Sequence, residues 1–347
     1  MNSKSPASNA LSVSLVTTVL NEREGCDVFL QSLIHQTRKP DEVVVVDGGS
    51  TDGTLDVIRS HAQRDPSIRL IEAPGCNIGQ GRNLGVQHAT GRIIVSTDTG
   101  CRLEPTWCER IVQPFDNDPQ VEFVGGTYKI DSHSSLEEII GAVTMRGVLD
   151  PIDPDTFNPS CRSMAYTKDL WERSGGFPEW TPVDDNLFNL RIRKMNVRRA
   201  HAADAVVHWR PRQTLKSLYK QFRVYASTTG HTQLDAGATR YNLRNMAITI
   251  ALLATGFLHP AFWIAGAASF LYFFVYNYHS KCRRVAKRCK LTNAYELAML
   301  VHWTVVAGDA VGYLHATWQR LRRNQWYAKM LQQYLNPEST GQQLATQ

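Results

Sequence analysis

Several polar residues stand where apolar, strand-like segments of this sequence end. The segment Val43 to Thr54 reads VVVVDGGSTDGT, so four valines lead directly into Asp47 and two glycines. Asn21 and Glu22 follow an earlier segment of this kind, and Asp98 ends a later one. Carboxylates accept hydrogen bonds from base N–H groups and ribose hydroxyls, and they also bind divalent cations. Nucleoside or cation binding is therefore open to these residues if the fold brings them together.

The segment Val43 to Thr54 has a second interpretation that needs no ligand. Gly48 and Gly49 allow a tight turn, and Ser50, Thr51 and Asp52 are good capping residues for a helix that follows. The segment on its own fits a capped strand-to-helix turn as well as a binding loop, so its neighbours in the fold decide between them.

Short β-rich runs alternate with helical patterns from Val13 to about Tyr128. The predicted strands are 14–19, 42–47, 69–73 and 92–98, and the predicted helices are 28–36, 55–62 and 81–89. Val43 to Val46 are apolar at every position, which indicates a strand covered on both faces. The pattern predicts an α/β fold with a mainly parallel, twisted sheet and helices on both faces. Ligands of such sheets bind at the carboxyl ends of the strands, where the polar residues stand.

Composition limits the possible classes of protein. The 347 residues are 43% hydrophobic and 20% charged, an ordinary globular balance that does not suit a multi-span transporter. The net charge of +6 suits anionic partners such as phosphorylated substrates or acidic lipids. Seven scattered cysteines without a CxxC pair favour reduced thiols, and the polar start MNSKSPASNA does not look like a secretory signal.

The order of the motifs resembles family 2 glycosyltransferases with a GT-A fold, the nucleotide-diphospho-sugar transferase type. The motifs are VSLVTTVLNE (13–22), VVVVDGGSTDGT (43–54), GRNLG (81–85), Asp98 after a strand, GGFPEW (175–180) and Asp184-Asp185. The resemblance covers about residues 12–230, and its specificity comes from the order and spacing of these motifs. It implies a transferase that moves a sugar from a nucleotide-sugar donor.

The resemblance also implies which residues bind the donor. The loop after the first strand, with Thr18, Leu20, Asn21 and Glu22, and the carboxylate of Asp47 would hold the nucleoside. Arg82 in GRNLG is similar to the family's basic residue near the sugar diphosphate, although it could also be a surface cation on a helix. The glycines of GQGRNLG do not match a Rossmann loop.

The fourth strand departs from the family pattern. Family members usually have Asp-x-Asp there for the ribose and a divalent cation, whereas this chain reads Asp98-Thr99-Gly100. Mg²⁺ or Mn²⁺ can be bound by one carboxylate with substrate phosphates and water, so the loss of one carboxylate weakens the expectation of a cation without excluding it. His208 could be a second metal ligand or a phosphate contact, or it could be satisfied by the backbone.

The family motif for the catalytic base is Glu-Asp, and Asp184-Asp185 stands in its place. Transfer with inversion needs a carboxylate that takes the proton of the acceptor hydroxyl. The resemblance assigns this base to Asp185 with Asp184 beside it, although two acids at a helix start are also favoured by the helix dipole. Arg223, in a helix predicted over 214–227, is loosely similar to the family's acceptor side, but the QxxRW motif of processive synthases is missing.

A long uncharged segment follows this region. Residues 246–276 contain no Lys, Arg, Asp or Glu, and Pro260 near the middle favours a break. Because basic residues flank both sides, we expect a membrane hairpin over about 244–278 that returns to the cytoplasmic side. The stretch 293–317 predicts an amphipathic helix lying in the interface or packing on the hairpin. Its residues His302 and Asp309 share a helical face, and solvation at the headgroup level is favoured over a functional pair.

Together these observations predict a tail at 1–11, a catalytic domain at 12–235, membrane-associated helices at 240–333 and a tail at 334–347. The expected partners are a nucleotide-sugar donor, a lipid-linked or glycan acceptor and the cytoplasmic membrane, with no nucleic acid. Two alternatives remain: a nucleotidyltransferase, and a nucleotide-sugar-binding membrane protein without turnover.

Overall fold

The computed structural model describes residues 11–145, 157–323 and 325–336. The predicted tails lie largely outside these residues. The chain divides into two compact units. The first takes residues 1–129, 152–209 and 334–347, and the second takes residues 130–151 and 210–333.

The first unit contains an eight-stranded sheet, and its first half is parallel. The strands are β1 (Val13–Val19), β2 (Glu42–Asp47), β3 (Ile68–Glu72), β4 (Ile93–Ser96), β5 (Cys101–Leu103), β6 (Phe123–Ile130), β7 (Met164–Thr167) and β8 (Arg199–Trp209). Their order is β3-β2-β1-β4-β7-β6-β8-β5. The first four strands in this order are parallel, whereas β7 is antiparallel to β4 and to β6, and β5 is antiparallel to β8. The α/β fold is confirmed, and the sheet is mixed where the sequence indicated a mainly parallel one.

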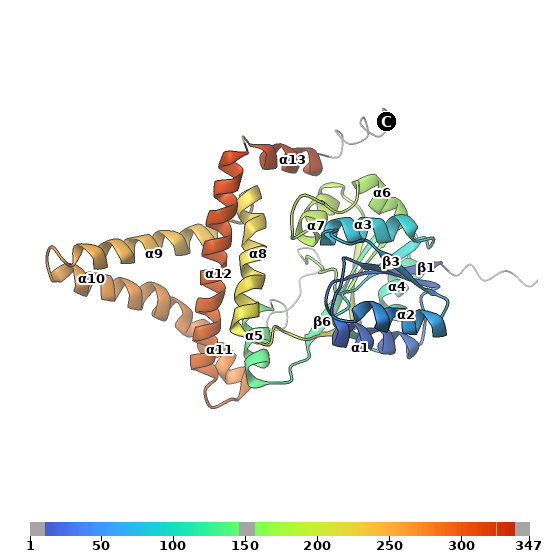
Figure 1. The fold of residues 1–347 in the computed structure, drawn as a ribbon, viewed down its shortest axis with the longest axis horizontal. Coiled ribbons are helices and arrows are strands. Elements are labelled where there is room, and N and C mark those ends of the chain that lie inside the picture. The colour runs from blue at the N-terminus through green and yellow to red at the C-terminus, as the bar shows by residue number, and fades with distance from the viewer. Residues whose placement is uncertain (1–10, 146–156, 324, 337–347) are drawn as a thin grey trace, which may run out of the picture. The chain divides into compact units, whose positions relative to one another are not determined.

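Helices cover both faces of this sheet (Figure 1). They are α1 (Arg23–Ile34), α2 (Thr54–Arg64), α3 (Ile78–His88), α4 (Trp107–Asn117), α6 (Lys168–Ser174) and α7 (Asp185–Lys194). Val43 and Val45 pack in the core under α1, α2 and α4, whereas Val44 and Val46 pack in the core under α3, α6 and α7. The run of four valines is buried on both faces for this reason, as the sequence pattern predicts.

The second unit is helical. Its elements are α5 (Ser135–Thr144), α8 (Leu215–Thr232), α9 (Gly237–Thr255), α10 (Ala261–Phe270), the π-helix η1 (Leu271–Tyr276), α11 (Asn277–Cys289) and α12 (Ala294–Arg322), and α13 (Trp326–Leu335) runs past its end. Glycines of α12 let it approach α8 closely, since a Cβ on Gly312 would lie 2.1 Å from the Arg223 carbonyl oxygen. The helix predicted over 214–227 thus packs with the helical unit, and the predicted boundary at 235–240 falls inside that unit.

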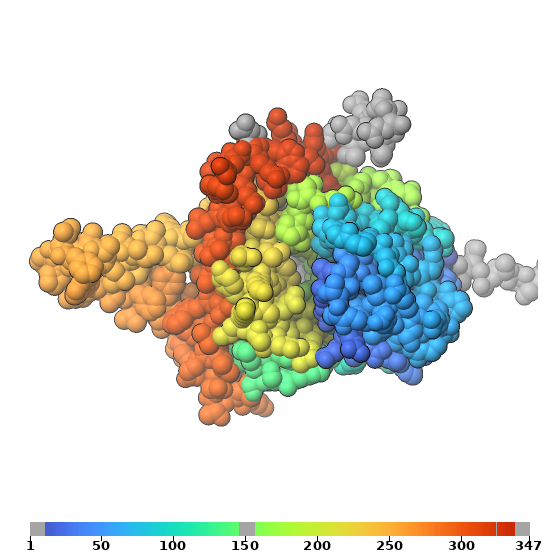
Figure 2. All heavy atoms as spheres, viewed as in Figure 1, coloured from blue at the N-terminus to red at the C-terminus, as the bar shows by residue number. Residues whose placement is uncertain are grey.

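Helices α9 and α10 form a hairpin that reverses between Gly256 and Pro260. Its base packs on α12, where Arg240 donates to the Tyr313 hydroxyl at 3.0 Å, and its tip projects beyond α12 (Figure 2). Its apolar side chains are unusually exposed: Phe257 is 84%, Leu258 is 83% and Ile264 is 74% exposed. Water does not favour so many large apolar side chains in one place, so this surface is suited to a lipid or protein environment.

Of the helices in the described ranges, α12 alone is long and apolar enough to cross a membrane. Less than half of its most apolar window is buried within the structure. The sequence predicts a membrane hairpin over about 244–278 and an amphipathic helix over 293–317, and the membrane role of the hairpin stays a prediction. Helix α12, which covers the second segment, packs along α8, α11 and α5.

Glu42 joins three segments of the sheet unit. Its carboxylate accepts hydrogen bonds from the hydroxyls of Ser14 (2.6 Å) and Thr90 (2.7 Å), and Arg69 lies 3.2 Å away. Burial raises the pKa of Glu42, but the bonds from Ser14 and Thr90 outweigh it and lower the pKa from 4.5 to about 2. A lowered pKa stabilises the folded state above the ordinary pKa, and this stability is lost as the pH falls towards 2.

We therefore predict that Glu42→Gln lowers the free energy of unfolding by about 2 kcal/mol at pH 7, and that the difference narrows between pH 4 and pH 2. Denaturant titrations across this pH range measure it. The matched control is Glu72→Gln, which removes a half-exposed partner of Arg59 and should cost less than about 1 kcal/mol. A pH-independent loss in Glu42→Gln would contradict the assignment.

Candidate active site

The loops after β1, β2 and β4 meet at the carboxyl edge of the parallel strands. The Asn21 backbone N–H donates to Ser50 Oγ at 2.9 Å, and the Thr51 backbone N–H donates to Asn21 Oδ1 at 2.8 Å. On the other side, Thr17 Oγ1 donates to the Thr97 carbonyl at 2.7 Å. The sequence-predicted positions on these three loops are therefore brought together by hydrogen bonds.

Asp47 is buried at the end of β2, with 1% of its surface exposed. Its Oδ1 accepts hydrogen bonds from the backbone N–H groups of Gly49 and Ser50, both at 2.8 Å. Its Oδ2 is also buried and has no partner in the described structure. A buried carboxylate oxygen without a partner is costly, so this atom is suited to accept a hydrogen bond from a ligand.

The loop after β1 surrounds the same edge. Asn21 adopts a φ of +52°, a left-handed conformation that Asn tolerates better than most residues, and Leu20 beside it is exposed. The carboxyl carbon of Glu22 would lie 3.9 Å from a Cβ added to Gly100. Thr99 Oγ1 donates to the Thr18 carbonyl at 3.4 Å, which places the Asp98–Gly100 turn directly against this loop.

Arg82 lies between two carboxylates. It projects from α3, is only 7% exposed, and its Nη1 lies 2.5 Å from Asp184 Oδ1 while its Nη2 lies 3.2 Å from Asp98 Oδ1. The guanidinium carbon lies 5.6 Å from the centre of the Phe177 ring. A buried charge is tolerated when it is paired and hydrogen-bonded, which both acids provide. Arg82 thus ties α3 to the end of β4 and to the start of α7.

Burial and charge oppose each other in this pair. Burial lowers the pKa of Arg82, but the carboxylates of Asp184 and Asp98 outweigh it and hold the pKa well above its usual value. Burial raises the pKa of Asp184, and the adjacent Arg82 offsets part of that rise. Asp184 Oδ2 has no partner among the described residues. Asp184 is therefore a buried partner of Arg82 and is poorly placed to exchange protons with a ligand.

Asp185 differs from its neighbour although the two are adjacent. It begins α7, is partly exposed, and its Oδ2 lies 3.5 Å from Ser160 Oγ. Its Oδ1 accepts a hydrogen bond from the Asn186 backbone N–H at 2.9 Å. Of the two acids, Asp185 is the one that a ligand can reach.

Arg162 is a cation of the site that the sequence interpretation missed. Its guanidinium lies 4.4 Å from the centre of the Trp209 ring, and its Nε lies 3.8 Å from Asp98 Oδ2. Its Nη1 donates to Ser160 Oγ at 3.1 Å, next to Asp185. No motif surrounds Arg162 in the sequence. It stands just before β7, and the strand order β7-β6-β8 brings it near Trp209 at the end of β8.

Comparisons with known proteins identify the family of the domain that contains these loops. Residues 14–157 match the model of "Glycosyl transferase family 2". The chain carries a family 2 glycosyltransferase domain. This domain holds the loops after β1, β2 and β4, whereas Asp184 and Asp185 lie beyond the matched residues.

Relatives of the family 2 domain come from bacteria and archaea. A putative glycosyltransferase, EpsH, of Bacillus subtilis is 31% identical over 101 residues, which are 29% of this chain and 29% of that protein. The glycosyltransferase AglE of Haloferax volcanii is 26% identical over 71% of this chain and 81% of that protein. The match to EpsH and to the other relatives of similar rank thus spans less than a third of their length.

A solved structure shares the fold. The mannosyltransferase PcManGT from Pyrobaculum calidifontis, in complex with GDP-Man and Mn²⁺, aligns with a TM-score of 0.55 and 20% identity over 88% of each chain. The likeness confirms the GT-A fold of the family 2 domain.

Not every residue implied by the family resemblance joins the site. His208 lies on β8, where Nε2 is 3.0 Å from Glu104 Oε1. The next residue on the strand, Trp209, contacts the Arg162 guanidinium with its ring and therefore faces the site. Side chains alternate between the two faces along a strand. His208 therefore faces away from Asp98. Arg223 lies on α8 in the helical unit, and its part in donor or acceptor binding stays a prediction.

The residues present fit a divalent cation with one protein ligand. Asp98 is partly exposed, although Arg82 and Arg162 each lie beside one of its oxygens. Gly100 supplies no second carboxylate, and the described residues contain no group of three His, Cys, Asp or Glu side chains suited to a metal. Mg²⁺ can be held by one or two carboxylates together with substrate phosphates, which is the arrangement that Asp98 allows.

We predict that Arg82→Gln destabilises the protein by about 3 kcal/mol or more, because it leaves Asp184 buried without its cation. In the double variant Arg82→Gln/Asp184→Asn, the loss should be smaller than the sum of the two single losses by at least about 1 kcal/mol. Chemical denaturation of the four proteins measures this coupling. Additive losses would show that the two side chains do not depend on each other.

Proposed function

We propose that the protein transfers a sugar from a nucleotide-sugar donor to an acceptor hydroxyl with inversion at the anomeric carbon. The observation that supports this proposal is that two carboxylates with different surroundings lie at one edge of the sheet. A buried, unpartnered oxygen of Asp47 is available to a nucleoside, and the accessible carboxylate of Asp185 stands near Arg162 and Asp98.

Donor binding would use the loops after β1 and β2. Asp47 Oδ2 would accept a hydrogen bond from the base or ribose, and the opposite oxygen is already held by Gly49 and Ser50. Leu20 and Asn21 would contact the nucleoside from the neighbouring loop, with Thr18 and Glu22 behind them. Because these loops are bonded to one another, the site would be largely formed before the donor arrives.

The chemical step needs one base and stabilisation of one leaving group. Asp185 would take the proton of the acceptor hydroxyl as its oxygen forms a bond to the anomeric carbon. The bond from that carbon to the diphosphate oxygen breaks with its electron pair, so the nucleoside diphosphate leaves with added negative charge. Attack opposite to the leaving group inverts the configuration of the carbon.

Positive charge would stabilise the leaving diphosphate. The Arg162 guanidinium is fixed between Trp209 and Asp98, and a preorganised cation stabilises developing charge without reorganising. A Mg²⁺ or Mn²⁺ ion held by Asp98 and the donor phosphates would supply further charge there. Arg82 would act indirectly, because its two carboxylate partners already occupy it and it holds Asp98 and α7 in position.

We predict that Asp185→Asn lowers the turnover rate by about 100-fold or more while donor affinity changes less than about threefold. Release of nucleoside diphosphate measures turnover, and titration of the donor measures affinity. Asp56→Asn is the matched control, because this exposed acid on α2 makes only a weak contact with Arg59 and should leave both quantities unchanged. If Asp185→Asn retained its turnover rate, Asp185 would not be the catalytic base.

The acceptor is proposed to be lipid-linked or membrane-proximal, at the cytoplasmic membrane face. The support is the hairpin of α9 and α10, whose exposed Phe257, Leu258 and Ile264 are suited to lipid, together with the basic residues that flank it. Insertion of such side chains into the apolar layer would attach the enzyme to its acceptor's membrane.

Replacing Phe257, Leu258 and Ile264 together by Ser is expected to shift most of the protein from the membrane to the soluble fraction, because each buried apolar side chain contributes about 1.5–3 kcal/mol. Membrane flotation measures the distribution. The matched control replaces three exposed apolar residues of the sheet unit, Leu20, Val28 and Ile34, by Ser. If both triple variants float with membranes like the unchanged protein, the hairpin is not the anchor.

A further inference from the structure

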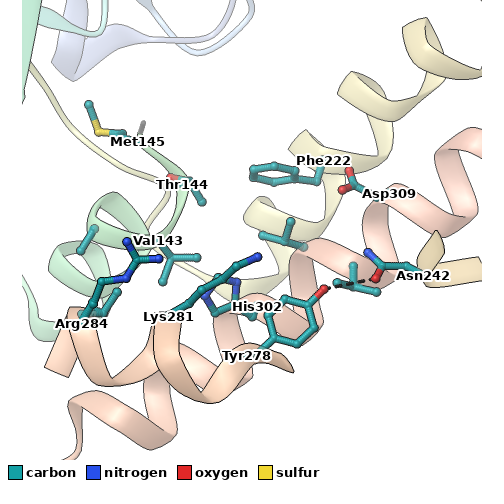
Figure 3. Close-up of a pocket in the computed structure, with 14 residues that line it drawn as sticks. Val143, Thr144, Met145, Phe222, Asn242, Tyr278, Lys281, Arg284, His302 and Asp309 are labelled. Carbon is teal, nitrogen blue, oxygen red and sulfur yellow. Dashed lines mark hydrogen bonds between the residues drawn. The ribbon is translucent and has the colours of Figure 1, made fainter. Parts of the chain in front are cut away.

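The helical unit contains a cavity that the proposed transfer reaction does not use. It has a volume of about 390 Å³ and is lined by α5, α8, α9, α11 and α12 (Figure 3). All of its lining residues belong to the second unit. Its size lies within the range of about 300–1,000 Å³ that is typical of small-molecule sites.

The walls of this cavity are partly apolar and partly charged. Val143, Met145, Phe222, Val305 and Val306 form apolar surface. Such a surface buries a hydrocarbon group but offers nothing to a wholly polar ligand such as a free sugar. The apolar wall therefore favours a ligand with a hydrocarbon part.

The charged groups are separated across the cavity. Arg284 and Lys281 come from α11, whereas Asp309 from α12 lies on the opposite side, near Phe222 and Asn242 (Figure 3). Lys281 and Arg284 are three positions apart, so they share one face of the helix with Tyr278. Two neighbouring cations suit a phosphate group. The carboxyl and amide groups on the other side suit hydroxyl groups.

The cavity also adjoins the proposed membrane-binding hairpin along the chain. Helix α10, η1 and α11 follow one another without a break from Ala261 to Cys289. Lys281 lies five residues after Tyr276, where the run of mainly apolar residues ends, and this separation is about 8 Å along a helix. Cations at such a distance from an inserted apolar segment lie where lipid phosphates are found.

We infer that this cavity binds an anionic phospholipid headgroup that carries hydroxyls, with the phosphate at Lys281 and Arg284 and the hydroxyls at Asp309 and Asn242. The first carbons of the acyl chain lie against Phe222, Val305 and Val306. This inference rests on the proposed membrane attachment and not on sugar transfer.

The test is a calorimetric titration of the detergent-solubilised full chain with dihexanoyl phosphatidylglycerol. No sugar donor is present. Unchanged protein should bind it saturably. Lys281→Gln/Arg284→Gln should weaken this binding about tenfold or more. Arg283→Gln/Lys287→Gln removes the same charge from exposed positions of α11 that do not line the cavity, and it should change the affinity less than about twofold.

Each other result overturns the inference. Equal weakening in both double variants would indicate diffuse attraction to a basic surface, and equally tight binding of dihexanoyl phosphatidylcholine would remove the need for net negative charge. Equally tight binding of glycerol 3-phosphate would indicate a soluble phosphate ligand. If the double variant does not fold, the single variants Lys281→Gln and Arg284→Gln replace it. Each is expected to weaken lipid binding about threefold. Because no donor is present, failure here leaves the transfer proposal untouched.

Discussion

The buried Arg82 guanidinium is the interaction on which the rest of the candidate site depends. A cation at this depth needs compensating charge, and the two acids that supply it come from the end of β4 and the start of α7. The same contacts therefore hold Asp98 beside Arg162. They also fix the position of Asp185, because Asp184, the residue before it, is paired with Arg82. Arg82 organises the site although it is too enclosed to be the main contact of a diphosphate.

This arrangement gives adjacent acids different roles. Asp184 and Asp185 have the same side chain, yet one is buried against Arg82 and the other is partly exposed near Ser160. Asp47 shows a similar division within a single side chain, since one oxygen completes a turn and the other has no partner. The binding-loop and capped-turn interpretations of this segment are thus compatible, because the turn orients the carboxylate.

Burial patterns in the sequence predict the sheet well. The run Val43 to Val46 predicts a strand covered on both faces, and the polar residues at the ends of three strands predict a site at one edge of the sheet. The same reasoning could not assign single polar side chains to faces. His208 and Trp209 are neighbours in sequence but project to opposite sides of β8. Arg162 becomes a site residue only because the strand order β7-β6-β8 brings it to Trp209. Likewise, an apolar run predicts a helix that is buried or inserted in a membrane, but it does not show which of the two applies. The run in α12 packs on α8, whereas the run in the hairpin of α9 and α10 is exposed.

Stabilisation by nucleotide sugars tests the central claim most directly. Thermal melting would be followed with UDP-, GDP-, CMP- and dTDP-sugars, each with and without Mn²⁺, for unchanged protein and for Asp47→Asn. One nucleotide class should raise the melting temperature of the unchanged protein, since a ligand at 100 times its Kd adds about 2.7 kcal/mol of stability. The shift should be largely lost in Asp47→Asn. No shift with any donor, or equal shifts in both proteins, would contradict a donor site at the end of β2.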